Sequence, residues 1–210
     1  MTKHDSNRIE LYTEENFLDA ADCAGLVELI KGALHPSAIF ISPSDTYDAT
    51  FRTSRSCSLS DKNALVAKLH ARIHQAFGLD LSFAETMEGQ HYEVGQAFKP
   101  HTDFYKEYEL KQHSTDRLGQ RTWTFMIYVG EPEGGGETRF VDLALTIEPK
   151  RGRALLWNNL LPSGAPNPWT RHESLPVTAG TKTIITKWFR APLQRDVVFS
   201  SPRYSWTQRA

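Results

Sequence analysis

Two histidines and an aspartate are the residues whose types and spacing most directly indicate chemistry in this chain. His101 and Asp103 are separated by one residue and follow the strand-like segment 90–98, QHYEVGQAF. In an extended segment, residues i and i+2 point to the same side, so both side chains could contact one metal ion. His172, 71 residues further on, begins another strand-like run and would complete a face of two histidines and one carboxylate. Such a face leaves positions open for a co-substrate and oxygen, which is typical of non-haem Fe(II) oxygenation.

The His-x-Asp spacing alone is weak, because eight histidines and 25 acidic residues can produce it by chance in a surface turn. Lys182, ten residues after His172, strengthens the case for a metal and co-substrate site. A short strand, a turn at Ala179-Gly180 and the next strand would bring the histidine and the ammonium into one cavity. A cation there can bind the distal carboxylate of a 2-oxo diacid whose keto acid end chelates the iron. The alternative is a solvated lysine on the exposed side of a strand.

Helices are expected in the N-terminal part of the chain. Asp19 can cap one amphipathic helix, and a second one follows Ser60 and ends at Gly78. Between them, residues 38–42 have the composition of a short strand. These helices carry no obvious chemistry and are expected to support the rest of the fold.

The β-rich part begins at about residue 85. Short runs of Val, Ile, Thr and aromatic residues alternate there with Gly, Pro, Asn or Asp, which favours an antiparallel sandwich or barrel. The run Glu133-Gly134-Gly135-Gly136 predicts a tight turn between two strands. Residues 105–120 are polar and without a pattern, so they predict a long loop of the kind that often serves as a lid or a binding element.

Composition excludes several other classes of protein. A formal charge of -1 gives no reason to expect binding to nucleic acid or to an anionic membrane. No run approaches the ~20 apolar residues of a membrane helix, and the first residues lack the character of a signal peptide. Cys23 and Cys57 have no metal-binding spacing. We therefore expect a cytoplasmic protein with reduced thiols.

Six sequence elements occur in an order and at distances that resemble the prolyl 4-hydroxylase branch of the 2-oxoglutarate oxygenases. The resemblance extends from about Phe17 to Arg190, and two departures from it are Glu88, where Gln is usual, and Val141, where Pro is common. The elements are NFLDAADCAGLVELI near the start, Arg52-Thr53-Ser54, Tyr92-x-x-Gly95-Gln96-x-Phe98-x-x-His101-x-Asp103, Arg121-x-x-Thr124, Gly135-Gly136-Glu137-Thr138-x-Phe140, and His172 with Lys182 and Trp188.

This resemblance implies a mainly β fold, the double-stranded β-helix or jelly-roll barrel, with flanking helices. It implies one domain over residues 1–210, with helical support over about 15–80, a catalytic barrel over about 85–190 and a tail over 191–210.

The resemblance also implies a role for each site residue. His101, Asp103 and His172 would bind Fe(II). Lys182, helped by the hydroxyls of Tyr92 and Thr138, would bind the C5 carboxylate of 2-oxoglutarate. Trp188 would lie near the iron, and Arg121 would either face the substrate or point outward from its strand. O2 is then the other co-substrate, and ascorbate is a candidate reductant.

The implied reaction is hydroxylation of a prolyl residue in a peptide or protein, with release of succinate and CO2. The main alternative is a hydroxylase of a free amino acid or another small molecule on the same fold. A nucleic-acid demethylase is disfavoured, because such enzymes carry a pair of arginines after the distal histidine and Lys182 stands at the first of those positions. A binding protein without a metal is disfavoured by the intact triad. The sequence leaves the oligomeric state open.

Overall fold

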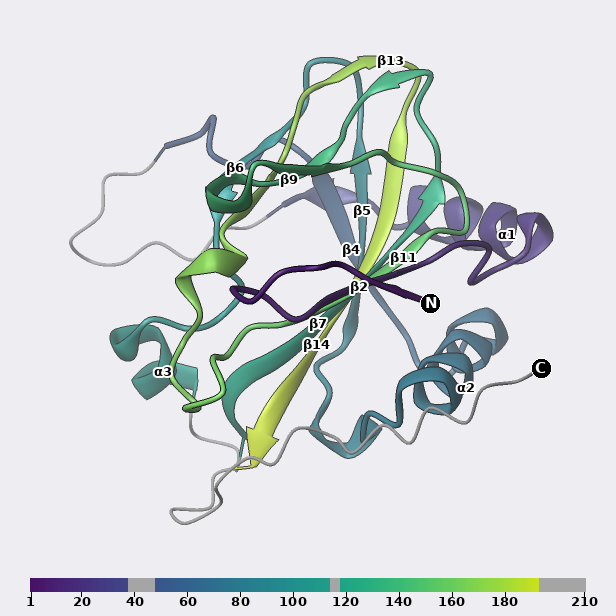
Figure 1. Cartoon of the computed structure of the whole chain (residues 1–210). Helices are drawn as coiled ribbons and strands as arrows, with labels where there is room; N and C mark the ends of the chain where they lie inside the picture. The colour runs from purple at the N-terminus through teal and green to yellow at the C-terminus, as the bar shows by residue number, and fades with distance from the viewer. Residues whose placement is uncertain (38–47, 114–117, 193–210) are drawn as a thin grey trace.

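A computed structural model describes residues 1–37, 48–113 and 118–192, and its strands form two large antiparallel sheets and one small one (Figure 1). In sheet order, the eight-stranded sheet consists of β1 (Thr2–Lys3), β2 (Leu11–Glu14), β11 (Ala154–Asn158), β7 (Leu118–Gly130), β14 (Lys182–Pro192), β5 (Met87–Tyr92), β4 (Arg55–Leu59) and β3 (His35–Pro36). The four-stranded sheet consists of β10 (Leu145–Ile147), β9 (Thr138–Phe140), β12 (His172–Ser174) and β6 (Phe98–His101). A further pair is β13 (Val177–Ala179) with β8 (Gly134–Gly135).

Alternation along the long strand β7 explains why the eight-stranded sheet has two buried faces. Residues that are two apart in a strand point to the same face. One set, with Phe125 and Ile127, packs with the helices, and the other, with Met126 and Tyr128, packs against the four-stranded sheet. Figure 1 shows the helices α1 and α2 on one side of the large sheet and β6 and β9 on the other. The described strands thus pair as separate sheets and not as one closed barrel.

The two N-terminal helices form where the sequence predicts them. In α1 (Ala20–Lys31), the Asp19 side chain accepts a hydrogen bond of 2.8 Å from the amide of Asp22. In α2 (Ala64–Phe77), Asn63 is the cap, so the helix begins a few residues later than predicted. It ends at Gly78, whose φ of 65° is left-handed. The strand predicted over 38–42 lies outside the described residues.

Two predictions about the connections are wrong. Residues 105–120 contain the helix α3 (Glu107–His113) and the start of β7, although they were expected to form a loop. An ion pair of 2.8 Å between Lys111 and Glu107, one helical turn apart, supports α3. The strand expected over 90–98 is interrupted, because β5 ends at Tyr92 and a turn with Gly95 at a φ of 83° separates it from β6.

Within the described residues, short 3-10 helices join some of the strands, namely η1 (Leu81–Phe83), η3 (Val141–Leu143) and η4 (Pro168–Thr170). Cys23 and Cys57 are buried free thiols, as expected. Among the helices of the described ranges, none combines the length and apolarity that crossing a bilayer requires.

Candidate metal and co-substrate site

The three predicted metal ligands meet at the edge of the four-stranded sheet. His172 in β12 is the cross-strand partner of His101 at the end of β6, and Asp103 follows two residues later. Directly opposite residues in an antiparallel ladder have side chains about 5 Å apart. One ligand atom from each of the three residues lies within 4.8 Å of the others. Strand pairing therefore brings together the two histidines that the sequence separates by 71 residues.

Backbone carbonyls set the orientation of both imidazoles. The Nδ1 atom of His101 lies 2.8 Å from the carbonyl oxygen of Lys99, and the Nδ1 atom of His172 lies 2.9 Å from that of Thr170. Because a carbonyl oxygen only accepts, each Nδ1 must carry the proton and donate it. Each Nε2 atom then keeps its lone pair for a metal ion, which is the usual arrangement around metal-binding histidines.

The local electrostatics favour the protonation state that metal binding needs. Burial, followed by the neighbouring imidazole of His172, lowers the pKa of His101. Burial alone would raise the pKa of Asp103, but the positive charge that His172 and His101 would carry outweighs it, so this pKa is lowered. Near neutral pH His101 is thus a neutral imidazole and Asp103 a carboxylate, which are the forms that bind divalent ions. Two imidazole nitrogens and a carboxylate on one side of a cavity fit Fe(II).

A small cavity of about 40 Å³ connects the triad to Lys182. Lys182 is fully buried at the start of β14, opposite Tyr92 of β5. Its Nζ atom donates a hydrogen bond of 2.8 Å to the hydroxyl of Ser174 and lies 5.1 Å from the ring centre of Tyr92 and 5.5 Å from that of Tyr128. Burial lowers the pKa of Lys182 to about 7. An anionic ligand bound next to such a buried ammonium would stabilise its charged form.

Tyr92 and Thr138 line the same cavity, as the resemblance implies. The Tyr92 hydroxyl donates to Gln90 at 2.7 Å, and the Tyr128 hydroxyl donates to Thr138 at 2.6 Å. Neither Tyr128 nor Ser174 was identified as a site residue from the sequence. Ser174 could have been found, because it follows His172 by two residues in one strand and therefore faces the same side.

Arg121 points inward and lies beside Asp103. Its guanidinium donates to both carboxylate oxygens of Glu85 at 2.7 Å and to the carbonyl oxygen of Asp103 at 3.3 Å. It also lies 4.1 Å from the ring centre of Trp188, which lines the cavity. The outward-facing alternative for Arg121 is therefore wrong, and its contact with substrate stays a prediction.

Two departures from the family pattern have structural counterparts in this region. Glu88 forms an ion pair with Arg52, and Arg52 lines the metal-site cavity. The Arg52 guanidinium also lies 5.0 Å from the ring centre of Phe98. Val141 begins the 3-10 helix η3, and its amide donates to the carbonyl of Arg171 at 2.9 Å.

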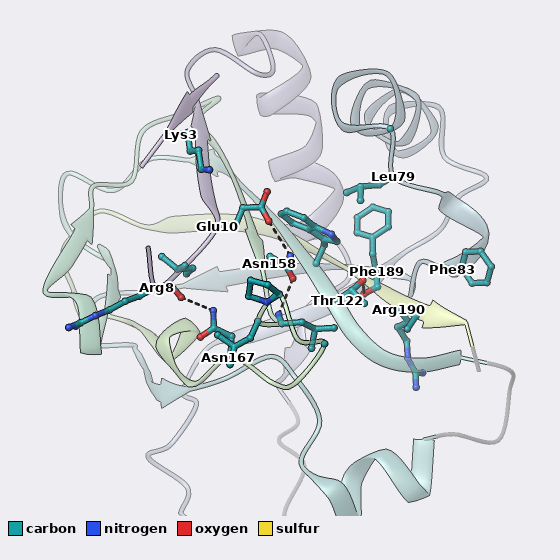
Figure 2. Close-up of a pocket in the computed structure, with 18 of the residues that line it drawn as sticks. Lys3, Arg8, Glu10, Leu79, Phe83, Thr122, Asn158, Asn167, Phe189 and Arg190 are labelled. Carbon is teal, nitrogen blue, oxygen red and sulfur yellow. Dashed lines mark hydrogen bonds between the residues drawn. The ribbon is translucent and has the colours of Figure 1, made fainter. Parts of the chain in front are cut away.

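A larger cavity of about 570 Å³ lies elsewhere, between the N-terminal residues and the ends of β11 and β14. Figure 2 shows Arg8, Glu10, Asn158 and Phe189 around it, with hydrogen bonds that tie its polar wall together. Over the described ranges, the triad is the one cluster of at least three potential metal ligands. We therefore place the chemistry in the smaller cavity.

Comparisons with known proteins agree with this site. The profile of the 2OG-Fe(II) oxygenase superfamily matches residues 87–190, which include all three metal ligands. The chain is 36% identical to the prolyl 4-hydroxylase subunit alpha-1 of Gallus gallus over 141 residues, 67% of this chain and 27% of that protein. It is 33% identical to the Homo sapiens subunit over 168 residues, 77% of this chain and 32% of that protein. The chain thus spans about a third of these relatives or less.

Solved structures show the same fold. The viral collagen prolyl hydroxylase of Paramecium Bursaria Chlorella virus-1, in a 2OG complex, aligns with a TM-score of 0.69 at 24% identity over 86% of this chain and 96% of that one. A Pseudomonas putida prolyl-4-hydroxylase aligns with a TM-score of 0.57 at 19% identity over 86% of this chain and 92% of that one. The predicted double-stranded β-helix is therefore confirmed. Because sequence, fold and metal ligands agree, the chain belongs to the 2OG-Fe(II) oxygenase superfamily and is prolyl hydroxylase-like.

Proposed function

We propose that this chain is an Fe(II)- and 2-oxoglutarate-dependent dioxygenase that hydroxylates a prolyl residue within a peptide or protein and releases succinate and CO2. The observation that carries the proposal is the buried ammonium of Lys182 in the same small cavity as the His101, Asp103 and His172 triad. A site for a carboxylate at one end and for a divalent ion at the other suits a 2-oxo diacid.

Each part of the site has a task in this reaction. Fe(II), when bound, supplies the oxidative decarboxylation of 2-oxoglutarate and the activation of oxygen. His101, Asp103 and His172 would hold the ion, and the cavity beside them would admit the keto acid. Lys182, supported by Ser174, binds the far carboxylate and so orients the keto acid toward the triad. The buried rings of Trp157 and Phe140, which pack against the imidazole of His172, help to exclude water from this residue.

The proline specificity rests on the relatives and on one physical argument. The curated relatives are prolyl 4-hydroxylase subunits, and a Trichoplax adhaerens prolyl hydroxylase in complex with a hypoxia inducible factor peptide fragment shares the fold at a TM-score of 0.56, with 16% identity and 86% coverage of this chain. An ion held by the triad could reach a residue of a peptide only if the peptide presents that residue in an extended or turned conformation. Proline suits this demand because its fixed φ orders the peptide at low entropic cost.

The residues before α3 are our candidates for contacting such a peptide. The ring of Tyr105 lies 4.6 Å from the guanidinium of Arg121, which in turn stacks on Trp188 of the cavity wall. Gln120 fixes the backbone of Tyr105 with hydrogen bonds of 2.6 Å and 2.7 Å. Strand β7, which contains Gln120 and Arg121, therefore holds this segment close to Trp188 of the cavity wall.

The test measures 2-oxoglutarate turnover against proline-containing peptides, free amino acids and methylated oligonucleotides. We expect peptides to stimulate succinate release and to gain one oxygen on proline by mass spectrometry, and we expect both effects to disappear in Asp103→Ala. If a free amino acid is oxidised efficiently and no peptide is, the small-molecule alternative is correct. Stimulation by a methylated oligonucleotide would contradict the proposal that nucleic acid is not a partner.

We also propose a reducing, cytoplasmic location. It is supported by the two free, buried thiols, because secreted proteins more often carry disulfides. Imaging the tagged full-length protein in its own cell would test this, and a lumenal signal would refute it.

A further inference from the structure

Two buried side chains, Thr124 and Asn159, form a series of hydrogen bonds that ends on Asp103, and Asn159 belongs to none of the sequence motifs. The Oδ2 atom of Asp103 accepts a hydrogen bond of 2.7 Å from the hydroxyl of Thr124, and that hydroxyl oxygen accepts one of 2.8 Å from the amide Nδ2 of Asn159. Thr124 and Asn159 are 0% exposed, so water does not compete for these bonds. We infer that Asn159 is a positioning residue of the metal site: through Thr124, it fixes which oxygen of Asp103 faces the ion. This inference rests on the proposed function.

The direction of each hydrogen bond follows from elementary chemistry. The Asp103 carboxylate only accepts, so Thr124 must use its one hydroxyl proton toward Asp103. The hydroxyl oxygen of Thr124 then acts as the acceptor, and the Asn159 amide is the group that donates to it. A donated bond on the oxygen polarises the hydroxyl and strengthens the bond it gives. Both hydrogen bonds are therefore donated in the same direction, from Asn159 to Thr124 and from Thr124 to Asp103.

The same bonds select the metal-binding oxygen of Asp103. With Oδ2 occupied by Thr124, the other carboxylate oxygen, Oδ1, lies 3.8 Å from the Nε2 atom of His101. One oxygen is thus held by the protein and the other is left for the ion. This arrangement favours coordination through a single oxygen and keeps other positions around the ion open.

Asn159 is itself fixed through its backbone. Its amide donates to the carbonyl of Thr122 at 2.7 Å, and its carbonyl accepts from the amide of Asn167 at 2.9 Å. Asn158 next to it and Asn167 belong to the wall of the larger cavity in Figure 2. These backbone hydrogen bonds fix the position of Asn159 just after the end of β11, beside β7.

An unpaired atom indicates that stability alone does not explain Asn159. Its Oδ1 atom is buried, and none of the described residues provides a hydrogen-bond partner for it. Leaving a buried acceptor unpaired costs stability, and an apolar side chain of similar volume avoids that cost. An asparagine at this place is better explained by what its Nδ2 atom does for Thr124.

The test is a titration of the metal-free full-length chain with Mn(II), in which electron paramagnetic resonance counts the free ion. We expect Asn159→Leu and Asn159→Ala to weaken Mn(II) binding by about tenfold to a hundredfold, the usual effect of losing a group that supports a metal ligand. Thr124→Val should weaken it similarly, and Thr124→Ser, which keeps the hydroxyl, should restore near-normal affinity. Asn158→Leu is the matched control on the neighbouring residue and should leave the affinity unchanged.

A double variant separates positioning from a general structural effect. If Asn159 acts through Thr124, Asn159→Leu should add nothing to the loss in Thr124→Val. The unfolding midpoint of metal-free Asn159→Leu should not fall below that of Asn158→Leu. Unchanged Mn(II) affinity in Asn159→Leu, or fully additive losses in the double variant, would overturn the inference alone. If His172→Ala binds Mn(II) as well as the wild type does, the proposed function fails with it.

Discussion

Replacing Lys182 by Met should stabilise the protein without ligands and weaken its binding of 2-oxoglutarate. Met keeps a similar length but removes the charge. The ammonium of Lys182 is fully buried, with a hydrogen bond of 2.8 Å to Ser174. Burial lowers its pKa from 10.5 to about 7. That gap corresponds to a cost on the order of 5 kcal/mol for carrying the charge in the folded state.

The sign of the pH dependence follows from the lowered pKa of Lys182. Between about pH 7 and 10.5 the unfolded chain binds this proton and the folded protein does not, so stability rises with pH across that window. Below about pH 7 the cost of the charge is fully present. Lys182→Met removes this dependence. At pH 7 the variant should be more stable by a few kcal/mol, after subtracting about 1 kcal/mol for the lost hydrogen bond to Ser174.

The effect on 2-oxoglutarate should have the opposite sign. A charge-assisted hydrogen bond contributes about 1.5–3 kcal/mol, so Lys182→Met should bind the co-substrate roughly tenfold to a hundredfold more weakly. In the wild type, affinity should fall as the pH rises above about 7, because binding must then take up a proton at Lys182. Lys182→Arg should rescue binding only in part, since its planar head needs a different pocket.

Two measurements check this reasoning about Lys182. Urea denaturation of the metal-free proteins between pH 6 and 9 gives the stability difference, and calorimetric titration of 2-oxoglutarate in the presence of Mn(II) gives the affinity. Equal 2-oxoglutarate affinity in Lys182→Met would show that another group holds the carboxylate. A variant that is less stable than the wild type at pH 7 would refute the argument from burial.

Three further predictions concern the metal, the acid side of the stability curve and a turn. His172→Ala should abolish Mn(II) binding and 2-oxoglutarate decarboxylation, whereas His113→Ala in α3 should spare both in the same assays; the reverse pattern would show a wrong ligand assignment. Burial, helped by Lys187, lowers the pKa of His70, so stability should fall as the pH drops below about 6.5; His70→Gln should flatten this fall in urea denaturation, and an unchanged slope would contradict it. Gly135→Ala should cost at least about 1–2 kcal/mol in the same assay, because a φ of 71° disfavours other residues and the added carbon would lie 2.3 Å from a backbone oxygen; a neutral change would refute this.

Local patterns in the sequence determined much of the fold and the metal ligands. The N-cap of α1, the glycine that ends α2, the alternation in β7 and the His-x-Asp spacing each depend on residues that are neighbours in the chain. Such patterns act through short-range geometry, so they can be interpreted without tertiary structure. The assignment of His172 and Lys182 needed more, namely the ordered family motifs, because nothing local ties either residue to His101.

Tertiary structure alone decided which distant groups touch. The ladder between β6 and β12 brings His172 opposite His101, and strand register is a property of the assembled sheet. Arg121 pairs with Glu85, 36 residues away, and Thr124 pairs with Asn159, 35 residues away. No periodic pattern in the sequence predicts either contact. Helix α3 was missed for a related reason. Its seven residues are all at least partly exposed, so it has no buried face whose apolar spacing the sequence could show.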